Sequence, residues 1–235
     1  MQFKVLDLGL IEFKAAWQIQ KEVFKDIKNS RLKSALILCQ HYPVITLGRQ
    51  ADKKNILLSE NELEAKGIEI YEIERGGDVT YHGPGQITAY PIFNLNYLKK
   101  DIHLFLRQLE KVVIDLLSDF GIMGLRYPGL TGVWIGKQKL ASIGIAIKNW
   151  ITFHGLSINI KQGDLDNFRF IRPCGMDIEM TALEKILNAN TDINDLKKLL
   201  IHKFRDTFPI SAVGGSAFGG GSRNVPRLAQ ETSLV

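Results

Sequence analysis

GVWIGKQKLASIGIAIKNWITFHGLSINI, residues 132–160, is the stretch that decides the fold of this chain. Apolar and β-branched residues recur over three segments, and GKQK and KNW separate these segments as turns. Strands joined by turns this short pair in antiparallel fashion. The stretch therefore predicts a three-stranded meander inside a larger sheet.

Helical and strand patterns on both sides of the meander complete an α+β sequence. The longest helix has an apolar stripe, a cap at Asp101 and a stop at Gly121, and a short helix has Ser59 as its cap with Glu62 three residues on. The expected helices are residues 14–28, 59–67, 101–120 and 192–208, and the further strands are residues 34–40, 43–48, 68–73 and 87–95, the second beside the first. The pattern predicts a single α+β domain, residues 1–210, with a mostly antiparallel or mixed β-sheet flanked by helices. Residues 211–235, with their Gly/Ser clusters, are expected to form a flexible C-terminal tail.

Composition narrows the class of protein. Hydrophobic residues make up 45% of the chain, which is enough for a full core, yet the apolar runs are far too short to span a membrane. The N-terminal residues MQFKVLDLGL lack the features of a secretory signal, and the two cysteines do not support a disulfide scaffold. We expect a cytoplasmic protein that does not contact membranes.

The net charge of +5 favours acidic partners through electrostatic steering. A dense block of Lys and Arg with interleaved aromatic residues would indicate nucleic-acid binding, and the sequence has none. Acidic proteins are therefore the expected partners.

A glycine-rich segment, RGGDVTYHGPGQ at residues 75–86, precedes the expected strand at residues 87–95. It matches neither of the two common phosphate-loop patterns, and Asp78 would repel a phosphate group. We expect the glycines Gly76, Gly77, Gly83 and Gly85 to let this segment wrap closely around a ligand.

Cys174 is the candidate nucleophile. Proline before it and glycine after it predict a tight turn, and nearby Arg169 and Arg172 would stabilise a thiolate. Cys39 lies in an apolar strand and is interpreted as a buried structural cysteine.

Lys139 and three histidines are further candidates. A lysine that opens a strand is usually a solvated edge residue, but small residues follow Lys139 and would let a ligand approach. His41, His82 and His154 sit at strand edges beside Gly or Pro. Their spacing lacks the close pairs that are typical of zinc sites, so we expect no metal.

Five motifs, in chain order, closely resemble those of the lipoyl(octanoyl) transferases. They are HYPVITLGR, RGGDVTYHGPGQ, TGVWIGKQKLASIG, TFHGLSINI and PCG, and the resemblance covers roughly residues 30–180. It implies the fold of the biotin and lipoate protein ligases. It also implies transfer of an octanoyl group from acyl carrier protein to a lysine of lipoyl domains. These acceptors would be the lipoyl domains of 2-oxoacid dehydrogenase E2 subunits and the glycine cleavage H protein. The resemblance implies no cofactor.

The resemblance also implies the site residues. Cys174 would carry the acyl group as a thioester, and Lys139 would activate it. The implied substrate-binding residues are Arg75, Gly76, Gly77, Asp78, Val79, Thr80, Tyr81, His82, Ser142, Ile143, Gly144, Gly155, Leu156 and Ser157, with His154 in support. We expect Val79 and Tyr81 to form apolar wall and His82 to orient the substrate. Backbone N–H groups around Gly175 are expected to hold the oxyanion.

Three alternatives stay open at this point. An ATP-dependent lipoate ligase would share the fold without needing a cysteine nucleophile. An amidotransferase would move octanoyl or lipoyl groups between carrier proteins with a cysteine of its own. A catalytically inactive module would only bind lipoyl domains or acyl carrier protein.

Overall fold

The structure, a computed structural model, describes residues 3–209 apart from the side chain of Cys174. It contains a seven-stranded sheet and a three-stranded sheet. In spatial order the larger sheet consists of β1 (Lys4–Ile11), β2 (Ser34–His41), β6 (Gln86–Phe93), β10 (Ile151–Asn159), β9 (Gln138–Lys148), β8 (Leu130–Ile135) and β7 (Leu125–Tyr127). The smaller sheet consists of β4 (Glu69–Glu72), β3 (Val44–Leu47) and β5 (Val79–His82). The predicted tail, residues 211–235, lies outside the described residues.

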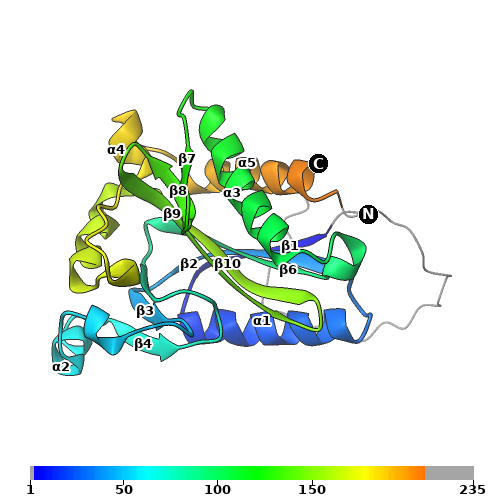
Figure 1. The fold of residues 1–235 in the computed structure, drawn as a ribbon, viewed down its shortest axis with the longest axis horizontal. Helices are drawn as coiled ribbons and strands as arrows, with labels where there is room; N and C mark the ends of the chain where they lie inside the picture. The colour runs from blue at the N-terminus through cyan, green and yellow to red at the C-terminus, as the bar shows by residue number, and fades with distance from the viewer. Residues whose placement is uncertain (1–2, 210–235) are drawn as a thin grey trace.

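Helices cover both faces of the larger sheet (Figure 1). The helices are α1 (Phe13–Lys28), α2 (Glu60–Glu64), α3 (Ile102–Ser118), α4 (Leu183–Leu187) and α5 (Ile193–Thr207), and the 3₁₀ turns are η1 (Lys53–Asn55), η2 (Leu95–Tyr97), η3 (Gln162–Phe170) and η4 (Pro173–Gly175). α1 packs against Cys39 and Tyr90, whereas α3 and α5 pack against Ile87 and Ala89. Because side chains alternate along a strand, these two pairs identify opposite faces of the sheet. We call them the α1 face and the α3 face.

Local signals account for the helices. The Asp101 carboxylate accepts a hydrogen bond from the backbone N–H of Leu104 at 2.9 Å, as expected for an N-cap. Ser59 and Glu62 form the predicted capping box at the start of α2. The three longer helices lie within one or two residues of their predicted bounds. The meander is confirmed as β8, β9 and β10, which pair antiparallel.

One prediction about the sheet was wrong, and one strand was missed. The strand at residues 43–48 was expected beside the strand at residues 34–40, but β2 has β1 and β6 as neighbours, and β3 pairs with β4 and β5 in the second sheet. β1 was not predicted. Its pairing with β2 shifts register between Asp7 and Leu10, where Gly9 has φ of 61°, and this irregularity disrupts the alternation that marks a strand.

Gly155 illustrates how tightly β10 packs against β6. A Cβ at this position would overlap the carbonyl oxygen of Ala89 and lie 2.7 Å from Cδ of Pro91. Because backbone cannot move aside cheaply, we expect Gly155→Ala to lower the free energy of unfolding by about 2–3 kcal/mol. Denaturant unfolding monitored by circular dichroism measures this change.

Gly163 supplies the matched control. A Cβ there would have no heavy atom within 4 Å. Gly163→Ala should therefore stay within about 0.5 kcal/mol of the parent chain. Equal stability of both variants would show that β6 and β10 are less closely packed than described.

Candidate active site

A cavity of about 410 Å³ lies between the larger sheet and the segment that starts at Arg75. This volume is within the usual range of small-molecule sites. The cavity brings together nearly all the residues that the resemblance singled out. Those that line it are Lys139, Arg75, Gly76, Gly77, Asp78, Val79, Thr80, His82, Ser142, Ile143, Gly144, His154, Gly155, Leu156 and Ser157.

Tyr81 does not line this cavity, so the expectation that it forms apolar wall was wrong. It lies on β5 between Thr80 and His82, and the alternation of side chains turns it to the other side of the strand. Its ring packs 5.5 Å from that of Phe168, and its hydroxyl accepts a hydrogen bond from Asn167 at 2.7 Å. Tyr81 therefore belongs to the core beneath the smaller sheet.

Gly83 and Gly85 also have a different role from the one predicted. Neither lines the cavity. A Cβ on Gly83 would lie 2.5 Å from the Asp164 carboxylate, and the backbone N–H of Gly85 donates to that same carboxylate. These glycines allow η3 to approach closely, so residues 83–86 form a structural corner.

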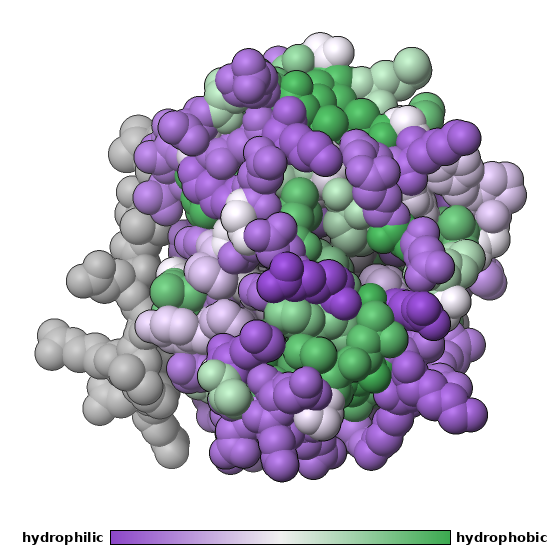
Figure 2. All heavy atoms as spheres, turned by 90° about the vertical axis from the view of Figure 1, so that its left-hand side faces the viewer, coloured by the Kyte–Doolittle hydropathy of each residue, from purple (hydrophilic) through white to green (hydrophobic). Residues whose placement is uncertain are grey.

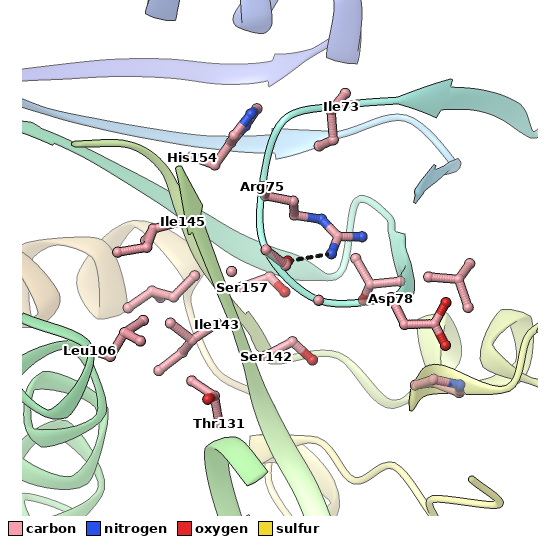
Figure 3. Close-up of a pocket in the computed structure, with 18 of the residues that line it drawn as sticks. Ile73, Arg75, Asp78, Leu106, Thr131, Ser142, Ile143, Ile145, His154 and Ser157 are labelled. Carbon is pink, nitrogen blue, oxygen red and sulfur yellow. Dashed lines mark hydrogen bonds between the residues drawn. The ribbon is translucent and has the colours of Figure 1, made fainter. Parts of the chain in front are cut away.

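Arg75 holds the first half of the segment in place. Its buried guanidinium donates to the carbonyl oxygen of Thr46 at 2.6 Å, to the Thr46 hydroxyl at 3.0 Å and to the carbonyl oxygen of Gly76 at 3.1 Å. Figure 3 shows this last bond, with the segment curving past Ser142 and Ser157. The backbone N–H of Gly76 donates to Ile145 of β9 at 2.9 Å. The segment is therefore fixed to both sheets.

Asp78 joins this segment to the turn that contains Cys174. Its carboxylate accepts hydrogen bonds from the backbone N–H of Asp52, at 3.1 Å, and from the side-chain amide of Asn55. The carbonyl oxygen of Asn55 in turn accepts from the backbone N–H of Arg172 at 2.8 Å. Asp78 thus acts through η1 to position η4.

Lys139 enters the cavity from β9 and is only 6% exposed. Its ammonium lies 5.1 Å from the centre of the Trp134 ring. A Cβ on Gly132 would come within 2.8 Å of Cε of Lys139, so the glycine leaves the space that the lysine side chain occupies. Lys139 is therefore not the solvated edge residue that a lysine at the start of a strand usually is.

The main chain around Lys139 is tied to the segment that follows Cys174. The backbone N–H of Lys139 donates to Glu179 at 2.8 Å, and its carbonyl oxygen accepts from Thr181 at 2.9 Å. Pro173, the first residue of η4, lines the same cavity as Lys139. The turn that carries Cys174 therefore reaches the cavity that Lys139 enters.

The backbone N–H of Gly175 is already used inside η4. It donates to the carbonyl oxygen of Arg172 at 3.0 Å, and the N–H of Met176 donates to Pro173 at 3.2 Å. In this arrangement Gly175 does not supply the expected oxyanion donor. Its φ of 65° instead lets the chain reverse immediately after Cys174.

His82 and His154 both border the cavity, and each ring has a different hydrogen-bond partner. Burial lowers the pKa of His82 to about 3, and the ring lies 3.2 Å from Oε1 of Gln86. Burial also lowers the pKa of His154, so its ring is neutral at pH 7 and donates from Nε2 to Glu74 at 3.3 Å. That hydrogen bond holds the pKa of Glu74 down to about 2. Both rings therefore act here as neutral groups of fixed orientation.

His41 lies beside His82, with 5.9 Å between the ring centres. Its Nδ1 bonds to the carbonyl oxygen of Ile11 at 3.0 Å, and its Nε2 bonds to the Tyr90 hydroxyl at 2.7 Å. His41 is thus a buried core histidine. Cys39 is fully buried nearby, which confirms its interpretation as structural, and burial raises the pKa of its thiol.

Sequence reasoning missed several residues of the site. Thr46 and Asn55 act through hydrogen bonds to the glycine-rich segment and the Cys174 turn, and Phe13 and Thr88 line the cavity. Thr46 lies in the quoted motif HYPVITLGR, which was a usable signal. Thr88 lies on the strand that directly follows the glycine-rich segment, whereas Asn55 and Phe13 lie on elements that only the folded chain brings close.

Within residues 3–209, no helix is long and apolar enough to cross a membrane.

Comparisons with known proteins agree with this architecture. Residues 12–205 match the family described as the lipoyl protein ligase A/B catalytic domain. An octanoyltransferase of Thermoanaerobacter pseudethanolicus is 43% identical over 209 residues, which cover 88% of this chain and 90% of the relative. An octanoyltransferase of Caldicellulosiruptor saccharolyticus is 44% identical over 199 residues, which cover 83% and 84% of the two chains.

Solved structures share the fold at low sequence identity. Lipoate-protein ligase A bound with ATP superposes with a TM-score of 0.69 at 15% identity, covering 88% of this chain and 85% of that one. The bipartite lipoate protein ligase of Thermoplasma acidophilum superposes with a TM-score of 0.68 at 15% identity, covering 88% of this chain and 84% of that one. The predicted α+β class with a lipoate-ligase-like sheet is confirmed.

Proposed function

This chain belongs to the lipoyl protein ligase A/B catalytic domain family, and we propose that it moves an octanoyl group from acyl carrier protein to a lipoyl-domain lysine through a thioester on Cys174. It is an acyltransferase of protein lipoylation, as its octanoyltransferase relatives are. The observation that best supports the proposed mechanism is that the Pro173–Gly175 turn and the buried Lys139 meet at one cavity.

In the first step the Cys174 thiolate attacks the thioester carbonyl of the donor. The new bond is between sulfur and the acyl carbon, and the bond to the carrier's sulfur breaks. The Lys139 ammonium stabilises the attacking thiolate and then gives a proton to the departing carrier thiolate, which leaves as a thiol. Lys139 is left neutral, and the enzyme holds the acyl group.

In the second step the acceptor lysine attacks the acyl-enzyme. This lysine arrives as a neutral amine, after leaving one proton in the solvent. Neutral Lys139 takes the proton that the nitrogen loses as the amide forms, and Cys174 departs as a thiolate. Both groups return to their starting state, so two carrier proteins can use the site in turn.

The acyl chain would lie in the cavity beside the glycine-rich segment. Val79 and Ile73 supply apolar surface there. Each buried CH₂ contributes about 0.8 kcal/mol, so wall contacts alone can hold a medium-length chain.

Exposed basic residues lie near the Cys174 turn and suit an acidic donor protein. Lys54 lies on η1, which contacts η4, and Arg169 and Arg172 precede the turn in the chain. Arg172 also pairs with Asp177 at 3.3 Å. The face that carries α2 and η3 combines hydrophilic side chains with hydrophobic patches (Figure 2). Positive charge at this place would steer acidic acyl carrier protein and lipoyl domains toward the cavity. We place the reaction in the cytoplasm, where thiols stay reduced.

Intact-mass spectrometry with octanoyl-acyl carrier protein, without ATP, tests the proposal. We expect the enzyme to gain one octanoyl group and to lose it when a lipoyl domain is added. If no adduct forms, and transfer needs ATP and free octanoic acid, the chain is a ligase that works through an adenylate. If the adduct forms but no lipoyl domain discharges it, the proposed acceptor is wrong.

A further inference from the structure

Three hydroxyl side chains form a row across the larger sheet. Ser157 on β10 pairs directly with Thr88 on β6 and with Ser142 on β9. Directly paired residues point to the same face, and all three line the cavity on the α1 face. Figure 3 shows Ser142 and Ser157 directed toward the glycine-rich segment, away from Ile143 and Leu106. We call these three residues the hydroxyl row.

The row begins beside Lys139 and leads away from it. Gly132 on β8 pairs with Ser142, and the Lys139 side chain occupies the space next to Gly132. Thr88 lies two strands beyond Ser142, and this corresponds to about 10 Å because neighbouring strands are roughly 4.8 Å apart. A fully extended acyl chain advances about 1.3 Å per carbon–carbon bond, so the octanoyl group spans about 9 Å from its first to its last carbon. Thr88 therefore lies near the last carbons of an acyl chain that starts at the Lys139 end.

The Thr88 hydroxyl is buried without a hydrogen-bond partner among the described residues. Thr88 is 1% exposed, its direct cross-strand partners are Ser157 and Cys39, and the Tyr90 hydroxyl on the same face of β6 bonds to His41. Thr152 shows the usual situation in this sheet, because its buried hydroxyl donates to Pro91 and accepts from Phe93. A plain alkyl chain would leave the Thr88 hydroxyl unsatisfied, which is unfavourable in a buried place.

We propose that Thr88 is a specificity-determining residue that hydrogen-bonds an oxygen atom on the last carbons of the acyl group. The inference rests on the proposed acyl transfer and adds a substrate class to it, medium-chain acyl thioesters with a terminal hydroxyl or oxo group. The substituent is neutral, because taking a carboxylate into this buried end would cost far more than a hydrogen bond returns. Thr88 can bind either a hydroxyl or an oxo group, since its own hydroxyl both donates and accepts a hydrogen bond.

Thr88→Val tests the inference, because valine keeps the shape and removes the hydroxyl. Transfer to a lipoyl domain is measured with octanoyl-, 8-hydroxyoctanoyl- and 3-hydroxyoctanoyl-acyl carrier protein. We expect the ratio of kcat/KM for the 8-hydroxy donor to that for the octanoyl donor to fall about tenfold or more in the variant. The corresponding ratio for the 3-hydroxy donor should change less than threefold, because its hydroxyl would lie toward the Lys139 end.

Each other outcome has a defined meaning. Equal ratios in the parent chain and Thr88→Val would overturn the inference, as would a parent chain that rejects the 8-hydroxy donor. Loss of octanoyl transfer in the parent chain would instead overturn the proposed function. Thr152→Val is the folding control: it should lower the melting temperature because it breaks two hydrogen bonds, whereas Thr88→Val should not lower it.

Discussion

Replacement of Cys174 by alanine is expected to abolish octanoyl transfer, with a fall in kcat/KM of about 10⁴-fold or more. The reason is that the proposed reaction has no second nucleophile: without the thiolate, the acyl group must pass directly between two carrier proteins. Removal of a catalytic nucleophile elsewhere has cost as much as about 10⁶-fold. The measurement is single-turnover transfer from octanoyl-acyl carrier protein to a lipoyl domain, with the intact mass of the enzyme followed in parallel.

Cys39 provides the matched control for this variant. It is buried in the core beneath α1 and does not line the cavity. Cys39→Ala should lower stability through lost packing but still form the octanoyl adduct. Retention of transfer by Cys174→Ala would contradict the proposed mechanism, and loss of the adduct in Cys39→Ala alone would move the acyl group to the other cysteine.

Replacement of Lys139 by methionine is expected to lower kcat/KM by about 10³-fold. Methionine keeps much of the apolar stem that packs near Trp134 but removes the ammonium. The variant therefore loses both the stabilisation of the thiolate and the base that accepts the proton of the incoming lysine. Both half-reactions should slow, and single-turnover experiments with preformed acyl-enzyme separate them.

Lys137→Met is the control, because Lys137 is exposed in the turn between β8 and β9. It should transfer octanoyl groups at the parent rate. A small primary amine such as ethylamine, added to Lys139→Met, should restore part of the activity, since it can occupy the space left by the ammonium. A purely structural role for Lys139 would show no such rescue, and an unchanged rate in Lys139→Met would remove it from the mechanism.

Local patterns predicted those parts of the fold that depend on neighbours in the sequence. The three longer helices and the β8–β10 meander follow from periodicity, caps and short turns. The partner strands of β3 could not be predicted in this way, because the sequence of a four-residue apolar strand does not specify which other strand it pairs with. β1 was missed for a related reason, since Gly9 and the bulge at Asp7 disrupt its alternation.

In the site, too, the sequence predicted local features but not the contacts between distant residues. The motifs identified Arg75, Asp78 and Lys139 as important, yet how each side chain acts depends on contacts made by distant residues. Asp78 is linked to the Cys174 turn through Asn55, and the space for Lys139 depends on Gly132. The position of Tyr81 could have been foreseen from strand alternation, had Val79–His82 been interpreted as a strand instead of a loop.

The placement of β6 between β2 and β10 has a consequence for synthesis of the chain on the ribosome. β2 precedes β6 in the chain, but Leu156, which pairs with Ala89, is translated much later. At roughly 5–20 residues per second, β6 spends about 3–13 s with one hydrogen-bonding edge and its cavity-lining residues unpaired. Nascent chains that contain β6 but not yet β10 are therefore expected to be bound by chaperones. A ribosome that stalls in this interval would leave the edge of β6 exposed and prone to aggregation.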